Sequence, residues 1–263
     1  MERDLYPLIG RTVVVTGASR RAGIGHAIAC RAASYGANLV VHHFAPHDDQ
    51  QPWGGDDVAA VLDSVRGDLV PSARMIDVHA DLTDPDAPEQ LLDAATAEFG
   101  LIDALVCNQA LSGSDGALGD LTAENLDRHW AVNTRASILA AQAFADRHHP
   151  GTQGAIVFMT SGQQRGPMPG ELAYAAAKAG LAGVTPTIAD QLADSGIRVN
   201  CVNPGPIDTG YMTDEHKMEL VRRFPFGRIG NPNDAARLVV WLCTDDASWI
   251  TGQVMDSEGG FRR

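Results

Sequence analysis

The fold is decided by residues 11–35, RTVVVTGASRRAGIGHAIACRAASY. The first six residues are rich in β-branched side chains and predict a strand, and apolar residues at helical spacing over 24–35 predict a helix. The loop between them contains Gly17, Gly23 and Gly25, which allow a tight turn and a close approach of the backbone to a ligand. This order is typical of the first unit of a dinucleotide-binding fold, in which N–H groups at the helix N-terminus bind a pyrophosphate.

The same alternation of strand and helix continues along the chain. Further strands are predicted at 38–43, 73–78, 102–107, 153–160, 197–202 and 253–256, and further helices at 58–66, 87–99, 122–147, 172–193 and 233–244. Such an alternation predicts a parallel sheet that is covered by helices on both faces. We therefore expect a single α/β domain over residues 1–263, doubly wound and Rossmann-like, with a seven-stranded and mostly parallel sheet.

Three segments depart from this regular pattern. Residues 44–57 are rich in turn-forming residues and predict a long loop. Residues 211–226 are polar and charged, as in segments that close over a substrate. Pro186 lies inside the predicted helix at 172–193, where it removes a backbone donor, so we expect a kink near residues 182–186.

Composition excludes several classes of function. The 263-residue chain has a formal net charge of −13, which argues against nucleic acid or an anionic membrane as a partner. We find no apolar signal segment and no run of eighteen apolar residues, so we expect a cytoplasmic protein. The four cysteines are widely spaced within apolar runs, without a CxxC or Cys/His cluster, and we expect no metal site.

The stretch SGQQRGPMPGELAYAAAK, residues 161–178, carries the candidate chemistry. On a helix that begins near Leu172, Tyr174 and Lys178 lie one turn apart on the same face. A nearby ammonium lowers the pKa of a phenol, so Tyr174 is a candidate general acid or base. Ser161, at the end of the preceding strand, could hydrogen-bond the same substrate oxygen.

The cofactor is expected to be NADP(H) rather than NAD(H). The second strand ends in His43 and Phe44, where an acidic residue would otherwise hydrogen-bond a ribose 2′-OH and repel a 2′-phosphate. Arg20 and Arg21 in the glycine loop could pair with that phosphate. Four aspartates within 44–57 oppose this assignment, because they make the local field less positive.

Two further polar residues have alternative interpretations. Asp81, followed by Leu82, lies where a chain that crosses the carboxyl ends of the strands could touch adenine, or it could cap the helix after Pro85. Asn133 lies within an otherwise apolar helical face, where it could be a satisfied core amide or a functional group.

Over nearly its whole length the sequence resembles the classical short-chain dehydrogenase/reductases. The matching segments are TGASRRAGIG at 16–25, HADL at 79–82, NQA at 108–110, Asn133, Ser161, YAAAK at 174–178, NPGPIDT at 203–209, and RIGNPNDAA through ITGQVMDSEGG at 228–260. Within the family, the ITGQ and terminal GG segments look most like the 3-oxoacyl-acyl-carrier-protein reductase branch.

The resemblance implies a role for each matched position. Tyr174 would donate or accept the proton, Lys178 would lower the pKa of Tyr174 and bind the nicotinamide ribose, and Ser161 would polarise the substrate oxygen. Asn133 would hold a water in the proton relay, and Ile207 and Thr209 would contact the nicotinamide carboxamide. The full set of expected cofactor-binding residues is Gly17, Ser19, Arg20, Arg21, Gly23, Ile24, Gly25, His43, Asp81, Leu82, Asn108, Tyr174, Lys178, Pro204, Gly205, Ile207 and Thr209.

Three departures from the family pattern are visible. The glycine loop is two residues longer than usual, Gln109 replaces a glycine near the cofactor, and Pro186 interrupts a helix that commonly packs in a tetramer interface. We expect a homotetramer or homodimer that reduces a small-molecule ketone or a 3-oxoacyl group with NADPH, although an acyl carrier protein is itself acidic and suits this acidic chain poorly.

Three alternative functions remain. One is an NAD-dependent alcohol dehydrogenase of the same fold. A second is an enoyl reductase, which the longer glycine loop suggests, although the tyrosine and lysine of such enzymes are spaced more widely. The third is a non-catalytic dinucleotide-sensing protein.

Overall fold

A computed structural model describes residues 4–263, and its core is a seven-stranded sheet in the order β3-β2-β1-β4-β5-β6-β7. All neighbouring strands pair in parallel, so the predicted doubly wound α/β fold is confirmed. The strands are β1 (Thr12–Val15), β2 (Asn38–His43), β3 (Met75–His79), β4 (Ala104–Cys107), β5 (Gly154–Met159), β6 (Ile197–Asn203) and β7 (Val254–Asp256). The order reverses between β1 and β4, and open α/β sheets bind ligands at such a point, outside the carboxyl ends of the strands.

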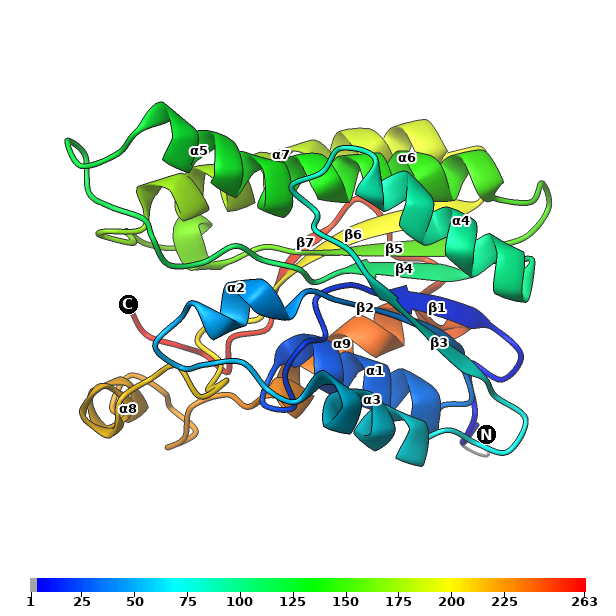
Figure 1. Ribbon diagram of the computed structural model, residues 1–263, viewed down its shortest axis with the longest axis horizontal. Helices are drawn as coiled ribbons and strands as arrows, with labels where there is room; N and C mark the ends of the chain where they lie inside the picture. The colour runs from blue at the N-terminus through cyan, green and yellow to red at the C-terminus, as the bar shows by residue number, and fades with distance from the viewer. Residues whose placement is uncertain (1–3) are drawn as a thin grey trace.

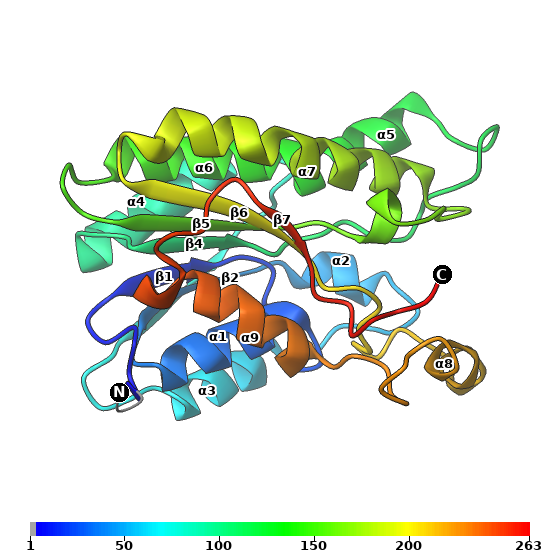
Figure 2. The same ribbon diagram turned by 180° about the vertical axis from the view of Figure 1, so that it is seen from behind.

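Helices cover both faces of the sheet (Figures 1 and 2). One layer contains α1 (Ile24–Ser34), α3 (Val58–Gly67) and α9 (Pro232–Leu242), and the other contains α4 (Ala87–Phe99), α5 (Ala123–Trp130), α6 (Ala136–Arg147) and α7 (Leu172–Ala193). Two short helices, α2 (Ala45–Asp49) and α8 (Asp214–Val221), lie at the end of the molecule where the chain terminates. In residues 4–263 no helix has the length and apolar character needed to cross a membrane.

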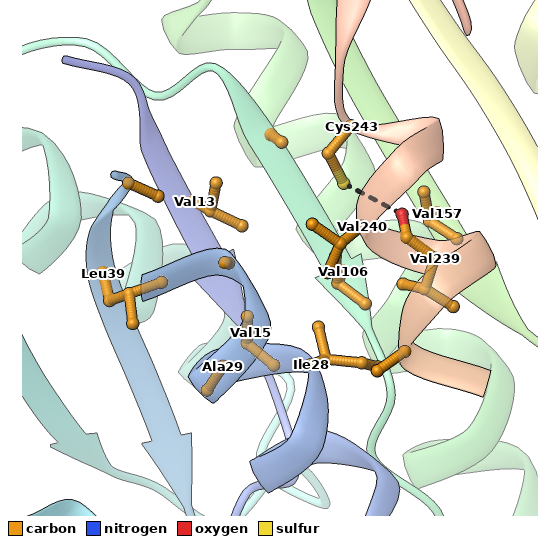
Figure 3. Packing of buried hydrophobic residues seen from close by; sticks show 14 of the residues in the cluster. Val13, Val15, Ile28, Ala29, Leu39, Val106, Val157, Val239, Val240 and Cys243 are labelled. Carbon is orange, nitrogen blue, oxygen red and sulfur yellow. Dashed lines mark hydrogen bonds between the residues drawn. The ribbon is translucent and has the colours of Figure 1, made fainter. Parts of the chain in front are cut away.

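The central strands are buried on both faces, which is why their sequences are continuous apolar runs rather than alternating ones. On one face, Val15 of β1 and Val106 of β4 pack with Ile28 of α1 and Val239 of α9 (Figure 3). On the other face, a second cluster joins β4, β5 and β6 to α4, α6 and α7. The two clusters hold the sheet rigid, so the loops at its carboxyl edge have a fixed base.

Several local expectations needed correction. The predicted helix at 122–147 is three elements, because a π-helical turn at Ala131–Arg135 separates α5 from α6. The predicted loop at 44–57 contains α2, and the polar segment at 211–226 contains α8.

The helix α7 runs continuously through Pro186. A proline leaves the carbonyl four residues earlier without its helical donor. Next to it, the Thr185 hydroxyl donates to the Leu181 carbonyl oxygen at 2.9 Å. The carbonyl that loses its donor at Pro186 is that of Ala182, so this bond does not replace the missing one.

The central position of β4 gives a stability prediction. Leu105 is fully buried, and we expect Leu105→Ala to lower the free energy of unfolding by about 2–5 kcal/mol through lost burial and the cavity that remains. Leu118 is 90% exposed, so Leu118→Ala should change that free energy by less than about 0.5 kcal/mol. Urea denaturation followed by circular dichroism measures both, and equal effects of the two substitutions would contradict the assigned core.

Candidate active site

The loops after β1 and β4 meet at the point where the strand order reverses. Gly17 has φ +70°, and a Cβ on it would lie 2.7 Å from the Cα of Gln109. A Cβ on Gly25 would lie only 2.3 Å from the Gly17 carbonyl oxygen. Both positions therefore require glycine, because a side chain would push the loop away from the sheet.

Asn108 and Gln109 hold this junction together. The Asn108 amide donates to the carbonyl oxygens of Thr16 and Gly17 at 3.1 and 3.0 Å. The side chain of Gln109 donates to the Val132 carbonyl oxygen at 3.1 Å, and its oxygen accepts from the Thr16 hydroxyl. Gln109 is thus turned toward the π-helical turn, and its side chain ties β1 and β4 to that turn.

The N-terminus of α1 is open to an anion. Its N-cap residue is Gly23, no side chain caps it, and its first turn contains no acidic residue. The N–H groups of Ile24 and Gly25 belong to this turn, where no intrahelical acceptor exists. Free donors and the helix dipole together attract phosphate oxygens, so this end of the cleft fits a dinucleotide.

The end of β2 carries two histidines with different surroundings. His42 accepts from the Gly17 N–H at 3.1 Å, so its other nitrogen donates to the Ala80 carbonyl oxygen at 3.0 Å. Burial lowers the pKa of His42 to about 4, which keeps this ring neutral. His43 is also buried, lies 3.3 Å from the Asp77 carboxylate, and has a ring nitrogen without a partner in residues 4–263.

Three other predicted residues line the same end of the cleft. The Ser19 hydroxyl accepts from the Phe44 N–H at 3.0 Å and so joins the glycine loop to the end of β2. Leu82 is buried. Asp81 accepts from the Thr83 N–H at 2.9 Å in a local turn, and the N-cap residue of α4 is Asp86, so the helix-capping alternative for Asp81 is wrong.

Both arginines of the glycine loop already have partners. Arg20 donates to the Thr209 carbonyl oxygen at 2.8 Å and lies 3.7 Å from Asp48, so it spans the loops after β2 and β6. Arg21 binds Asp56 with two guanidinium nitrogens, at 2.9 and 2.7 Å. The aspartates between residues 44 and 57 therefore meet these arginines directly, and a 2′-phosphate would have to compete with them.

The candidate catalytic residues converge beside this cleft. Lys178 is 2% exposed, donates to the Met159 carbonyl oxygen at 2.9 Å, and places its Nζ 5.7 Å from the centre of the Tyr174 ring. Ser161 follows β5, and its hydroxyl faces the phenol of Tyr174 closely enough to lower the pKa of that phenol. The helical spacing of YAAAK and the position of Ser161 thus bring three side chains together, as the sequence predicts.

The expected direction of the Tyr174 pKa is wrong for this structure. Burial raises the pKa of Tyr174 to about 12, although the Ser161 hydroxyl acts in the opposite sense. Burial also lowers the pKa of Lys178 to about 8. Removing water from both groups disfavours their charged forms, and for Tyr174 this outweighs the effect expected from a nearby ammonium.

Asn133 lies in the π-helical turn and is fully buried. Its side-chain oxygen accepts from the Leu111 N–H at 2.9 Å, and its amide donates to the Leu111 carbonyl oxygen at 3.0 Å. The side chain is therefore committed to the loop between β4 and α5. In this arrangement Asn133 holds the wall of the cleft by direct backbone contacts.

The loop after β6 forms the opposite wall. Gly205 has φ +68°, and a Cβ there would lie 2.9 Å from the Glu258 side chain, so Pro204 is followed by an obligatory glycine. Ile207 is buried and forms a parallel bridge with Gly230. Thr209 is held by Arg20, as described above.

The start of the polar segment packs against the loop after β2. The rings of Tyr211 and Trp53 meet edge to face at 6.2 Å between centroids. Asp208, which precedes this segment, pairs with Lys217 of α8 at 2.8 Å. These contacts attach the polar segment to the loop after β2 and attach α8 to the loop after β6.

Sequence reasoning missed two residues of the site. Asp115, in the loop between β4 and α5, accepts hydrogen bonds from the backbone of α7 next to Tyr174. Arg263 pairs with Glu258 and packs against Gly166, so the end of the chain lies on the turn that follows Ser161. Neither has a local sequence signal, because their partners are distant in the chain or carry no motif.

Residues 4–263 contain no group of three or more His, Cys, Asp or Glu side chains that could hold a metal ion. The groups that do converge are an open helix N-terminus, a glycine cradle and a buried lysine. This set fits a dinucleotide, with its phosphates at α1 and one ribose near Lys178.

Comparison with known proteins agrees with this geometry. A family model described as "Enoyl-(Acyl carrier protein) reductase" matches residues 17–262. An uncharacterized oxidoreductase, YjdA, of Bacillus subtilis (strain 168) is 41% identical over 255 residues, which cover 96% of this chain and 97% of that protein. A chloroplastic NADPH-dependent aldehyde reductase-like protein of Arabidopsis thaliana is 34% identical over 97% of this chain and 95% of its own length.

Solved structures show the same likeness. A reductase named LugOII, described as promiscuous and as catalysing keto-reduction at C1 in lugdunomycin biosynthesis, superposes with a TM-score of 0.83. It is 31% identical, and the match covers 97% of this chain and 98% of that one. The sheet order, the cleft and these relatives together show that the chain belongs to the short-chain dehydrogenase/reductase family of NAD(P)-dependent oxidoreductases.

Proposed function

We propose that this oxidoreductase uses NADPH to reduce the carbonyl group of a small, uncharged ketone or aldehyde to an alcohol, with Tyr174 as the proton donor. The observation that carries the proposal is the convergence of Ser161, Tyr174 and Lys178 beside the glycine cradle. A bound reduced nicotinamide supplies the hydride, and the protein supplies position and electrostatics.

The side chains have complementary roles in this reaction. Ser161 donates a hydrogen bond to the substrate oxygen and orients the carbonyl, while Tyr174 transfers its proton to the same oxygen as negative charge develops there. Lys178 binds ribose hydroxyls and stabilises that negative charge with its ammonium. The Met159 carbonyl holds Lys178 in place, and because an ammonium has three donors, two remain for a ligand.

The protonation state of Tyr174 favours reduction over alcohol oxidation. A phenol with a pKa of about 12 keeps its proton at neutral pH, so it is ready to act as an acid. Oxidation of an alcohol would need the phenolate as a base, and that form is rare at this pKa. The protonated phenol therefore favours a reductase over an alcohol dehydrogenase that works in the opposite direction.

Charge supports a neutral substrate. Near the cleft, Glu171 and Asp208 both act on the Tyr211 phenol and raise its pKa, which burial has already raised. The chain as a whole has a formal net charge of −13. An acidic carrier protein would therefore be repelled, which speaks against a carrier-bound 3-oxoacyl or enoyl substrate.

We also propose a homo-oligomer, tetrameric or dimeric. Leu126 and Trp130 of α5 and Leu172 of α7 are large apolar side chains that are 40–46% exposed. The helices α5 and α7 pack against each other, so these side chains belong to one continuous helical layer. A second copy of the chain would cover this surface.

The role of Tyr174 is tested by Tyr174→Phe. We expect ketone-dependent oxidation of NADPH to fall by about 10²- to 10⁴-fold, because the proton donor is lost while the ring and its packing remain. Binding of NADPH, followed by fluorescence titration, should stay within about 3-fold of the wild type. A panel of aldehydes and ketones first identifies a substrate for this assay. Equal turnover by the wild type and Tyr174→Phe would contradict the proposed mechanism.

The preference for NADPH rests on the end of β2 and on the arginine pair. No carboxylate follows β2 at the ribose position, since His43 and Phe44 stand there. The Arg21 side chain is 55% exposed in its pair with Asp56, and ion pairs that are this exposed contribute little to stability. A 2′-phosphate can therefore displace Asp56 at small cost and gain a charge-assisted interaction.

The proposed phosphate contact is tested by Arg21→Ala, which leaves the bond between Arg20 and the Thr209 carbonyl in place. We expect the Kd for NADPH to rise about 10- to 100-fold, because charge-assisted hydrogen bonds contribute roughly 1.5–3 kcal/mol. The Kd for NADH should change less than about 3-fold. The control is Arg74→Ala, which removes an exposed arginine just before β3 that pairs with Glu98. Equal losses of affinity for the two cofactors would show that Arg21 does not contact the 2′-phosphate.

The lowered pKa of Lys178 predicts a pH dependence for cofactor binding. Burial lowers this pKa to about 8, so the ammonium is present at pH 7 and is lost as the pH rises through 8 to 9. Affinity for NADPH should therefore decrease over that range in the wild type. Lys178→Met should bind more weakly at pH 7 and show no decrease between pH 7 and 9.5. Titrations at several pH values measure this, and a decrease that persists in Lys178→Met would assign it to another group.

A further inference from the structure

Asp115 accepts three hydrogen bonds from backbone N–H groups, two of which belong to α7. It lies in the loop between β4 and α5, 59 positions before Tyr174 in the chain. One carboxylate oxygen accepts from the N–H groups of Gly116 at 2.7 Å and Ala173 at 3.0 Å. The other oxygen accepts from the N–H group of Tyr174 itself at 2.8 Å.

These bonds replace a cap that α7 lacks. The N-cap residue of α7 is Glu171, and its side chain makes no capping hydrogen bond. The first N–H groups of a helix need acceptors from outside it, and a carboxylate there also interacts favourably with the helix dipole. Burial opposes ionisation of Asp115, but the hydrogen bonds from Tyr174, Ala173 and Gly116 outweigh it and lower its pKa. The group is therefore a carboxylate at neutral pH.

The loop that carries Asp115 is fixed at its other end as well. Asn133, in the π-helical turn, binds both the N–H and the carbonyl oxygen of Leu111. The next residue, Thr134, donates to the Ala177 carbonyl oxygen of α7 at 2.7 Å. Residues 111–116 thus form a brace between the π-helical turn and the first turn of α7.

We propose that Asp115 is a positioning residue for Tyr174, because its carboxylate holds the backbone of Tyr174 against the braced loop and so fixes the phenol relative to Ser161 and the substrate oxygen. The inference rests on the proposed role of Tyr174 as proton donor. A shift of about 1 Å in a reacting group can cost about 10²-fold in rate, so the hydrogen bonds that Asp115 accepts from the N–H groups of Ala173 and Tyr174 matter for catalysis and not for stability alone.

The test compares Asp115→Ala and Asp115→Asn with Asp120→Ala. Asp120 is an exposed carboxylate of the same loop, and it makes no side-chain hydrogen bond or ion pair within residues 4–263. We expect kcat of Asp115→Ala, per folded site, to fall about 10- to 100-fold with the Kd for NADPH within about 3-fold. Asp115→Asn keeps one acceptor oxygen but turns an amide toward the remaining N–H, so its kcat should lie between those of Asp115→Ala and the wild type. Asp120→Ala should match the wild type.

A double variant separates positioning from a general loss of structure. If Asp115 acts through Tyr174, then Asp115→Ala should lower the residual rate of Tyr174→Phe by less than about 2-fold, since the group that it positions is already gone. A purely structural role would lower the rate by the same factor in both backgrounds. That outcome, or a wild-type kcat in Asp115→Ala, would overturn the inference.

The two proposals fail in different ways. If Tyr174→Phe turns over as fast as the wild type, the proposed function fails at its proton donor. If Tyr174→Phe is impaired while Asp115→Ala is not, only the positioning role of Asp115 fails. Thermal denaturation of each variant gives the folded fraction, and Asp115→Asn provides a measurement where Asp115→Ala yields too little folded protein.

Discussion

The start of α1 passes so close to the end of β1 that a Cβ on residue 25 would lie only 2.3 Å from the Gly17 carbonyl oxygen. The candidate site depends on this close approach, which only a glycine at position 25 allows. Because neither residue has a side chain, α1 can begin directly below the end of β1. Asn108 then bonds the carbonyls of Thr16 and Gly17, which fixes β4 beside the same loop. The first N–H groups of α1 are consequently held at the edge where the strand order reverses, a position that suits an anion.

A second constraint fixes the chemistry relative to that edge. Lys178 is buried against β5 through its bond to the Met159 carbonyl, and the Thr160 hydroxyl donates to the Lys178 carbonyl oxygen at 3.0 Å. Helix α7 is therefore attached to the end of β5 at Lys178 and to the loop after β4 at its first turn. Tyr174 lies between these two attachments. Its position follows from the geometry of one helical turn, so the phenol inherits the rigidity of the sheet.

Local patterns predicted the parts of this site that depend on local geometry. The strand–glycine–helix order located the glycine loop between β1 and α1, and the i, i+4 spacing brought Tyr174 and Lys178 to one face, because both follow from backbone periodicity. The π-helical turn at 131–135 and the role of Gln109 were not predictable in this way, since they arise from contacts between distant segments. The same holds for Arg21, whose partner Asp56 is 35 positions away, and for the pKa of Tyr174, which depends on burial.

Burial raises the pKa of Tyr174 and lowers the pKa of Lys178. At neutral pH the pair therefore carries one positive charge, on the lysine. Tyr174 stays neutral, and Lys178, with a pKa of about 8, remains mostly charged at neutral pH. The thiols of Cys107 and Cys201 lie near this ammonium. Burial raises the pKa of each thiol to about 12, so both stay neutral and neither supplies a negative charge to balance the lysine. A buried ammonium without a carboxylate partner is costly to maintain. In the proposed reaction this cost is offset when hydroxyl oxygens of a bound ribose complete the hydrogen bonds of Lys178 and when negative charge develops on the substrate oxygen beside it. The same charge that weakens the fold would then favour the transition state.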